Sequence, residues 1–383
     1  MDLQAFAMTP PPQPQPAASK PVLNAAAAVN RRKAARRMAI PTRYIVTSAR
    51  QLSVLVKTGI PLVQSIKILA DQTEHAGFKQ VLSGVQRDIE GGSNFSEALS
   101  HYPNAFSELY VSSVAAAEVG GVLDKVLIRL AEMMERDQEI ASDVQAALRY
   151  PVLVVVAILV AVIVLMVFVI PRFASIYARF QTDLPLPTKI MILGSNILLK
   201  GWMFVVPGTI GLAFGIRSFL RTRLGRFQWD HLKLRLPIFG SLFLKIAMNR
   251  FGSMLALLYG NGVPVLRALE VVSRAVGNVA IGRQIGAVAK SVKEGKGLSG
   301  GLERASYFTP LIRHMVAVGE VTGSLQEVLD NVVTYYEMEV KNAIKNLTTL
   351  IEPILTAVLG TVVLGLALAI YLPLWNLMAL FKH

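Results

Sequence analysis

The stretch Val318-Gly-Glu-Val-Thr-Gly-Ser-Leu325 decides the fold, because the chain contains a near twin of it, Ala116-Ala-Glu-Val-Gly-Gly-Val-Leu123. Each stretch is followed by an amphipathic helical pattern and then by a long apolar run. Self-similarity at a fixed spacing indicates one structural unit used more than once. The sequence therefore predicts a soluble helical block with a membrane exit, present in two copies. The matched pairs, all 202 positions apart, are Glu118 with Glu320, Gly121 with Gly323 and Leu123 with Leu325.

The repeat extends in both directions from these stretches, at a shift of 203 residues upstream and of 202 residues downstream. Upstream, the break Gly59-Ile60-Pro61 recurs as Gly262-Val263-Pro264, where glycine suits the end of one helix and proline the start of the next. Downstream, an apolar stripe at helical spacing occurs in both copies, which predicts an amphipathic helix in each. The stripe consists of Leu123, Val126, Leu127, Leu130 and Met134 in the first copy and Leu325, Val328, Leu329, Val332 and Tyr336 in the second.

Composition places part of the chain in a lipid bilayer. Of the 383 residues, 53% are hydrophobic and only 17% are charged, and the mean hydropathy is +0.49. A soluble protein of this size carries more charge than that. The chain has no cysteine, which excludes a disulfide, a cysteine-bound zinc site and a thiol nucleophile.

Three segments are apolar enough to cross the membrane. Pro151 to Ile170 contains no polar side chain and, as a helix, spans about 30 Å of hydrocarbon. It corresponds to Pro353 to Leu372 in the second copy, and a weaker segment at 197–216 lies between the two. In that weaker segment Gly211 and Gly215 form a Gly-x-x-x-Gly pair, which suits either packing against a neighbouring span or self-association into a homo-oligomer.

The distribution of positive charge predicts the orientation. The net charge is +14, and basic residues gather before the first span and after the second, whereas the loop between those spans holds few. Cytoplasmic segments keep the excess of lysine and arginine, so the N-terminus and both blocks are expected in the cytoplasm and the C-terminus outside. The basic segment 217–249 is expected to lie on anionic lipid, which explains its charge without nucleic acid.

Residues 1–41 are rich in proline and alanine and end in a basic cluster. Such a composition is typical of a disordered arm. The segment lacks the apolar core of a signal peptide. It is expected either to touch anionic lipid or an acidic partner, or to serve as a solvated linker.

The residues show no combination typical of an enzyme. The five histidines have neither the spacing of metal ligands nor a nucleophile beside them. The stretch Glu294-Gly-Lys-Gly297 departs from a phosphate-binding loop, because Lys290 stands where glycine is required and Gly297 where serine or threonine is required. We therefore predict a protein that is not an enzyme, with no catalytic, cofactor-binding or metal-binding residues.

Three glutamates are candidates for structural or partner-coupling roles. Glu118 and Glu320 each lie in the last turn of a predicted helix, where the helix dipole disfavours a carboxylate by roughly 0.3 to 1 kcal/mol. A carboxylate there in both copies suggests a basic partner, either within the block or on another protein. Glu352 lies where the third span enters the membrane, which favours an interfacial ion pair over a proton pathway. The other candidates are the turn residues Gly59, Pro61, Gly121, Gly262, Pro264 and Gly323.

Taken together, these residues resemble the type II secretion system F-domain family, the inner-membrane platform proteins of type II secretion and type IV pilus machines. The resemblance covers about residues 50–376 and rests on the Gly-x-Pro turns, the repeated Glu-Val-x-Gly-x-Leu motif, and the span entries Tyr150-Pro151 and Glu352-Pro353. Ala117 stands where the family motif has glycine, as Gly319 does in the second copy, so the first copy is expected to hold its glutamate differently.

The resemblance implies three spans, two cytoplasmic bundles of a six-helix type and no cofactor. It also implies a hexameric cytoplasmic assembly ATPase, pilin or pseudopilin subunits and other inner-membrane assembly proteins as partners. The expected fold is therefore an all-α multi-pass protein of the bacterial inner membrane. The expected segments are an arm at 1–41, a first bundle at 42–150, a span at 151–171, a periplasmic loop at 172–196, a span at 197–216, a basic interfacial segment at 217–249, a second bundle at 250–352, a span at 353–376 and a periplasmic tail at 377–383.

The function that follows is a scaffold that couples the ATPase to polymerisation of pilin or pseudopilin. The alternative is a small membrane transporter or channel subunit. That alternative is disfavoured because the first span has no polar residue and three spans provide little lining for a pathway. The residues do not distinguish a secretion system from an adhesive or conjugative pilus, nor do they say which bundle contacts the ATPase.

Overall fold

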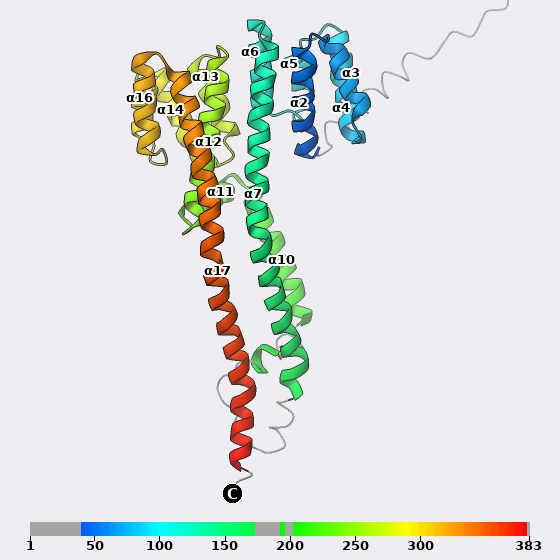
Figure 1. The fold of residues 1–383 in the computed structure, drawn as a ribbon, viewed down its shortest axis with the longest axis vertical. Coiled ribbons are helices and arrows are strands. Elements are labelled where there is room, and N and C mark those ends of the chain that lie inside the picture. The colour runs from blue at the N-terminus through cyan, green and yellow to red at the C-terminus, as the bar shows by residue number, and fades with distance from the viewer. Residues whose placement is uncertain (1–39, 173–191, 196–201, 381–383) are drawn as a thin grey trace, which may run out of the picture. The chain divides into compact units, whose positions relative to one another are not determined.

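The computed structural model describes residues 40–172, 192–195 and 202–380, which form helices joined by turns and contain no strand (Figure 1). The expected all-α class is therefore confirmed for these residues. Most of the arm, most of the loop after the first span and the last residues of the tail lie outside them, and the predictions made for those segments stand as predictions. The chain divides into two compact units, Met1–Ser107 and Glu108–His383.

The first unit holds the first four helices of the first copy. Its core forms because apolar residues recur at helical spacing, so that Phe78, Val81 and Val85 share one fully buried face. The ring of Phe78 lies 6.4 Å from that of Phe106. These helices are α2 (Thr42–Lys57), α3 (Leu62–Gln72), α4 (Ala76–Glu90) and α5 (Phe95–Ser100).

The second unit holds the remaining helices of the first copy and the whole of the second. Its main core is built from α12 to α17 around Phe251, whose ring meets that of Phe308 edge-on at 4.8 Å. The helices are α6 (Glu108–Gly120), α7 (Leu123–Val164), the π-helical turn η1 (Leu165–Val169), α10 (Trp202–Arg221), α11 (Arg223–Arg235), α12 (Phe239–Gly260), α13 (Val265–Ala275), α14 (Val279–Lys293), α15 (Gly297–Glu303), α16 (Pro310–Thr322) and α17 (Leu325–Leu380).

Helices α6 and α7 belong to the first copy by sequence but pack with the second. Helix α6 contacts α12 and α13, and its Leu109 is part of the main core of the second unit. The first bundle was predicted over 42–150, whereas the first compact unit ends at Ser107. The two copies are thus repeats in sequence, but they do not correspond to the two compact units. The predicted domain boundaries stay a prediction.

The repeated turn before α3 and α13 has the geometry that its sequence predicts. Gly59 and Gly262 have φ angles of 85° and 82°, a region that side chains with a Cβ rarely adopt. Pro61 and Pro264 then immediately precede α3 and α13, both with φ of −53°. The break predicted from Gly59-Ile60-Pro61 is therefore present in both copies.

The two longest helices join the soluble part of the second unit to the membrane without a break (Figure 1). Helix α7 has 42 residues and α17 has 56, which correspond to about 63 and 84 Å. Bundle and span were predicted to meet at Pro151 and Pro353. Both prolines lie inside a continuous helix, although a proline removes one backbone hydrogen bond.

Three described helical segments are long and apolar enough to cross a bilayer: Leu123–Arg172, Phe239–Gly260 and Leu325–Leu368. The first and last contain predicted spans. The middle one is α12, and 61% of its most apolar window is buried inside the protein, so we assign it to the bundle core. The second span predicted from sequence falls instead on α10, whose Ile210, Phe214 and their neighbours are exposed. That α10 crosses the membrane stays a prediction.

A π-helical turn interrupts the first span just before Pro171. In η1 the amide of Ile170 donates to the carbonyl of Leu165, five residues back, instead of to that of Met166. The hydroxyl of Ser195 donates to the carbonyl of Met166 at 2.6 Å. A proline ring crowds the carbonyl four residues before it, so a wider turn at this position relieves that contact.

Candidate functional site: a glutamate corner and an ion-paired junction

The corner between α16 and α17 is closed by the carboxylate of Glu320. Its Oε1 accepts a hydrogen bond from the backbone amide of Leu298 at 2.7 Å, and Oε2 accepts one from Ser299 at 2.9 Å. Both amides belong to the first turn of α15, where backbone donors have no partner inside the helix. The groups that bind Glu320 are thus two backbone amides and the side chain of Ser299, not the basic side chain that the sequence suggested.

These contacts keep the carboxylate ionised. Partial burial opposes ionisation, but the hydrogen bonds from Ser299 and Leu298 outweigh it, so the pKa of Glu320 is lowered from its ordinary value of 4.5. A side chain on Gly297 would collide with the same carboxylate, since its Cβ would lie 2.7 Å from Oε1. The corner therefore depends on Gly297 as well as on Glu320, a dependence that the sequence did not reveal.

The positions around Glu320 complete the corner. Gly323 has φ of 72° and ends α16, and its twin Gly121 has φ of 66° after α6. Glu118 holds the matched place in the last turn of α6. In each corner the valine after the glutamate points away from the protein, because Val119 and Val321 are 93% and 89% exposed.

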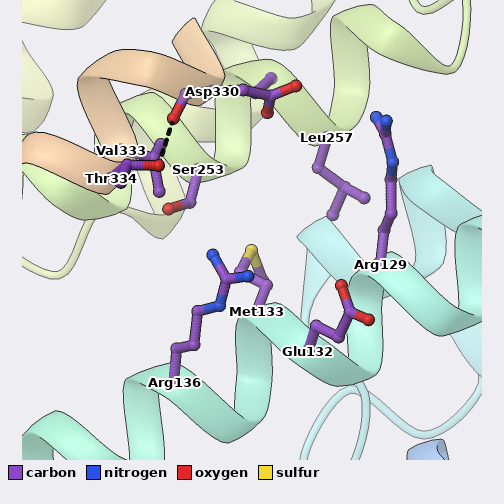
Figure 2. A pocket seen from close by; sticks show the side chains of 10 residues that line it. Arg129, Glu132, Met133, Arg136, Ser253, Leu257, Asp330, Val333 and Thr334 are labelled. Atoms are coloured by element: carbon purple, nitrogen blue, oxygen red, sulfur yellow. Dashed lines mark hydrogen bonds between the residues drawn. The ribbon is translucent and has the colours of Figure 1, made fainter. Parts of the chain in front are cut away.

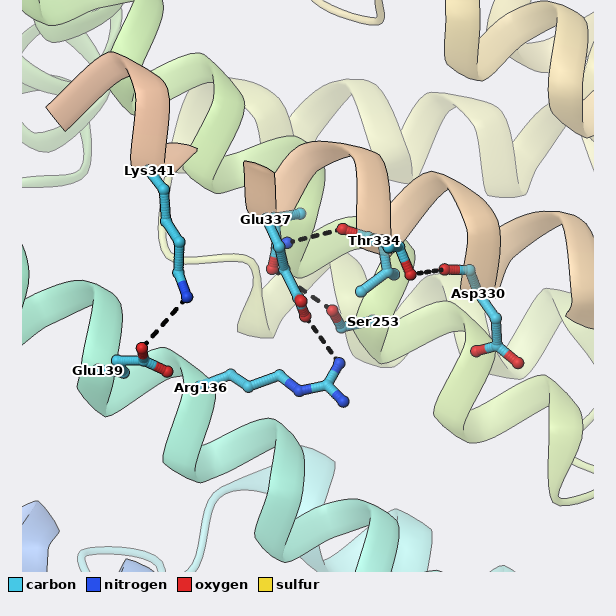
Figure 3. A network of polar contacts seen from close by, with 9 residues as sticks. Arg136, Glu139, Ser253, Asp330, Thr334, Glu337 and Lys341 are labelled. Carbon is cyan, nitrogen blue, oxygen red and sulfur yellow. Dashed lines mark hydrogen bonds and ion pairs between the residues drawn. The ribbon is translucent and has the colours of Figure 1, made fainter. Parts of the chain in front are cut away.

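The long helices of the two copies are joined by ion pairs (Figure 3). Arg136 Nη1 of α7 lies 2.7 Å from Glu337 Oε1 of α17, and Lys341 Nζ of α17 lies 3.3 Å from Glu139 Oε1 of α7. Glu139 and Lys341 are 202 residues apart and therefore hold equivalent positions in the two copies. The two copies thus meet along α7 and α17, and opposite charges stand at the matched position.

Helix α12 is joined to both long helices. Arg250 Nε lies 3.0 Å from Asp137 Oδ1 of α7, and Lys245 Nζ lies 2.6 Å from Glu339 Oε2 of α17. The amide of the buried Asn249 donates to the carbonyl of Val333 at 3.3 Å. We call these contacts, with the two α7–α17 pairs, the polar junction.

A cavity of about 280 Å³ lies within the polar junction (Figure 2). Residues from α7, α12 and α17 all contribute to its wall, and charged groups from α7 stand opposite a carboxylate from α17. A polar space between three helices leaves room for water and for small shifts of one helix against another. The lining residues are Arg129, Glu132, Met133, Arg136, Ser253, Ala256, Leu257, Asp330, Val333 and Thr334.

A further ion pair joins the first copy to the second above the junction. Arg274 of α13 makes a bidentate contact with Glu108 at the start of α6, with Nε 2.7 Å from Oε2. This hydrogen-bonded carboxylate raises the pKa of Arg274. The forked geometry fixes the direction of both side chains as well as their separation.

The remaining candidate, Glu352, lies on α17 directly before Pro353 and is exposed. An ion pair for it at the membrane boundary stays a prediction. No group of three or more metal-ligating side chains occurs among the residues that the structure describes. The residues of the polar junction were missed from the sequence, although the opposite charges at the matched positions of Glu139 and Lys341 were a visible signal.

Comparison with known proteins supports the repeat and identifies the family. The model of the family described as "Type II secretion system (T2SS), protein F" matches twice, at residues 48–171 and 251–373. The chain is 35% identical over 333 residues to the type IV pilus assembly protein PilC of Myxococcus xanthus, covering 87% of this chain and 80% of the relative. It is 37% identical over 330 residues to the PilC of Thermus thermophilus, covering 86% and 81%.

A third relative carries the other name used in this group. The type II secretion system protein F of Pseudomonas aeruginosa is 33% identical over 339 residues, covering 88% of this chain and 84% of the relative. Each of the two family matches contains one copy of the glutamate corner and all or most of one long helix. The chain belongs to the type II secretion system protein F family.

Proposed function

We propose that this chain is the inner-membrane platform of a type IV pilus or type II secretion machine. In this role it passes the motion of a cytoplasmic assembly ATPase to pilin or pseudopilin subunits that leave the membrane. The names of its relatives, pilus assembly protein and secretion system protein, support membership of such a machine. The scaffold needs no catalytic residue of its own, because the ATPase supplies the energy.

One observation carries this proposal: α7 and α17 each continue from the soluble bundle into an apolar span. Pro151 and Pro353 lie inside these helices, but each helix continues past its proline, so a displacement of the bundle is carried into the spans. The polar junction ties the two helices together above the membrane. These ion pairs and the cavity beside them leave α7 and α17 room to shift against each other, so force applied to one copy displaces its span relative to the other.

The proposed topology follows the distribution of charge. Arginines at 217, 221, 223 and 226 follow α10 or lie at its end, and cytoplasmic segments keep such an excess. We place the N-terminus and the helical bundles in the cytoplasm and the C-terminus in the periplasm. On the cytoplasmic side the partner is the ATPase. Within the membrane the partners are the pilin subunits and other assembly proteins.

A transporter or channel subunit is the weaker candidate. The exposed faces of the span in α7 carry valine and leucine, including Val152, Leu153 and Val160. A pathway for a polar solute needs polar groups or a water-filled cavity at membrane depth. The polar cavity described above lies instead in the soluble part of α7, at Arg129 to Arg136.

A chemical cross-link between α7 and α17 at the polar junction tests the proposal. The chain has no cysteine, so Glu139→Cys with Lys341→Cys introduces the only two thiols. The double variant, expressed in cells that lack the native protein, should support pili or secretion until a short bismaleimide links α7 to α17. Linkage should then abolish assembly, while the single-cysteine variants treated with the same reagent keep it.

Two further readouts complete that experiment. The purified chain should hydrolyse no ATP alone and should change the turnover of its assembly ATPase when both are present. Turnover by the chain alone, or normal assembly in cells expressing no protein of this family, would contradict the platform role. Full assembly after linkage would show that coupling does not require α7 and α17 to move relative to each other.

A further inference from the structure

Helix α11 has two sides with different surroundings. One side packs on the second bundle: the guanidinium carbon of Arg283 lies 4.0 Å from the ring centre of Phe227, His231 forms a hydrogen bond with Tyr307, and Leu234 packs against the main core. The side chains on this face are fixed by the bundle. The other side therefore keeps a constant orientation relative to α14.

The outer side of α11 is apolar and exposed. Leu224 is 69% exposed, Trp229 44% and Leu232 50%, and Leu236 just after the helix is 40% exposed. Large apolar side chains gathered on one face of a short helix indicate an interaction surface. Arginines at 223, 226 and 235 flank this face and are also exposed.

The charge on this surface has a single sign. The only acidic residue of α11 is Asp230, which is 4% exposed and turned into the bundle. A surface of leucine and tryptophan edged by arginine, without an exposed acid, complements the headgroups of anionic lipids. An acidic protein surface would pair with the arginines but would not bury the four apolar side chains.

Continuity with α10 places this surface beside the proposed second span. Helix α10 ends at Arg221, and Thr222 alone separates it from α11; the Thr222 hydroxyl accepts a hydrogen bond from the amide of Gly225 at 3.0 Å. A Cβ on Gly225 would collide with the carbonyl of Phe219, so the corner between the helices is as tight as glycine allows. Helix α11 therefore starts at the end of the span.

Asp230 connects this surface to the bundle. Its Oδ2 accepts a hydrogen bond from the amide of Val279 at 2.9 Å, and its carbonyl accepts one from Asn278 Nδ2 at 3.2 Å. Asn278 itself caps α14 by accepting from Ala280 and Ile281. The start of α14, where backbone amides need hydrogen-bond partners, is thus held both by Asp230 of α11 and by Asn278 just before α14.

We propose that α11 is a membrane-surface helix, whose leucines and tryptophan enter the headgroup region of an anionic leaflet and whose arginines bind lipid phosphates. Asp230 then holds the start of α14, and with it the second bundle, at the membrane surface. The inference uses the proposed topology of α10 but neither the ATPase nor the pilins. It can therefore fail or hold independently of the role in pilus assembly or secretion.

Trp229 provides the probe. In full-length protein with Trp202→Phe and Trp375→Phe, Trp229 is the only tryptophan. The protein is reconstituted in nanodiscs of phosphatidylglycerol or of phosphatidylcholine, each with a spin label shallow or deep in the acyl chain. The expected result is quenching of Trp229 about twofold or more stronger by the shallow than by the deep label, and stronger in the anionic lipid.

Matched charge variants separate specific binding from general attraction. Arg223→Gln, Arg226→Gln and Arg235→Gln together should remove the preference for anionic lipid. The control removes three exposed cations elsewhere on the bundle, Lys290→Gln, Lys293→Gln and Arg304→Gln. Lys290 and Lys293 lie at the far end of α14, up to about 22 Å from Asp230, so this control should keep the preference.

Each contrary outcome overturns the proposal. Emission of Trp229 typical of water, with no quenching by either label, would place α11 away from the membrane. Quenching that is absent in single-chain nanodiscs, together with shielding of Trp229 in nanodiscs holding two copies, would assign the surface to a second copy. Hydrogen exchange at Val279 to Ile281 tests the Asp230 contact: anionic lipid should slow it in the native chain and not in Asp230→Ala.

Discussion

The two copies of the glutamate corner share a backbone but differ in how closely their helices approach. Gly121 and Gly323 both have positive φ, and α7 and α17 both begin two residues later. Gly319, however, packs so tightly that a Cβ would lie 2.9 Å from the Cα of Leu325, whereas the matched Ala117 carries its Cβ and is fully buried. The glycine of the turn is thus a requirement of the backbone, while the residue before the glutamate sets the distance between helices.

Adding a methyl group to the tighter corner should have the largest effect. Gly319→Ala forces the backbone of α17 away from α16, and overpacking of this kind costs about 1 to 3 kcal/mol, of which the better helix propensity of alanine returns up to about 1. The matched Ala117→Gly should cost about 1 kcal/mol or less, through helix propensity and a small gap. Denaturant unfolding of the protein in detergent measures both. An equal loss in the two variants would show that the corners are packed alike.

Removal of the carboxylate should have the next largest effect. Glu320→Ala leaves the amides of Leu298 and Ser299 without their acceptor, a loss of about 1 to 2 kcal/mol. Glu320→Gln keeps one acceptor oxygen and should lose less. The same unfolding measurement applies, and Gly297→Ala should reproduce part of the defect with the glutamate intact.

The contribution of Glu320 should also depend on pH in a defined direction. Its pKa is lowered on folding, so its stabilisation is complete above the unfolded value of about 4.5 and is lost as pH falls through the folded pKa. The difference in stability between the native chain and Glu320→Gln should therefore be constant near neutral pH and shrink below about pH 4.5. A difference that grows with acidity would contradict the ionised corner.

Exchange of charges across the junction should have the smallest effect. Glu139→Lys or Lys341→Glu alone puts like charges together and should cost a few tenths of a kcal/mol, up to about 1, because both side chains are more than half exposed. The double exchange should restore stability. A double-mutant cycle measures the coupling, and additive losses would mean that the two helices are not paired at this position.

Much of the fold follows from pattern alone. The turn at Gly59 and Pro61, the end of α16 at Gly323 and the apolar spans were predictable because each depends on neighbouring residues: a positive φ, a fixed proline φ or a run without polar side chains. Because the sequence contains two copies of the repeat, each of these signals occurs twice. Family membership followed from the same features and is confirmed.

What escaped prediction depends on contacts between distant segments. The sequence placed the border between bundle and span at Pro151, where the run without polar side chains begins, but it did not show that a single helix, α7, runs through that border. Two partners of Glu320 are backbone amides of α15, which no side-chain pattern displays. The ion pairs of the polar junction join positions that lie far apart in the sequence, and only the matched positions of Glu139 and Lys341 hinted at them.

The π-helical turn in the first span limits how α7 moves. The carbonyl of Met166 has lost its usual partner within the helix and is held by the hydroxyl of Ser195. In hydrocarbon a carbonyl without a partner costs several kcal/mol, so rotation of α7 about its own axis is penalised as soon as that hydrogen bond breaks. Tilting keeps the two groups together. In the proposed role, tilting of α7 is therefore the motion that keeps this hydrogen bond, and rotation about the helix axis is the motion that breaks it.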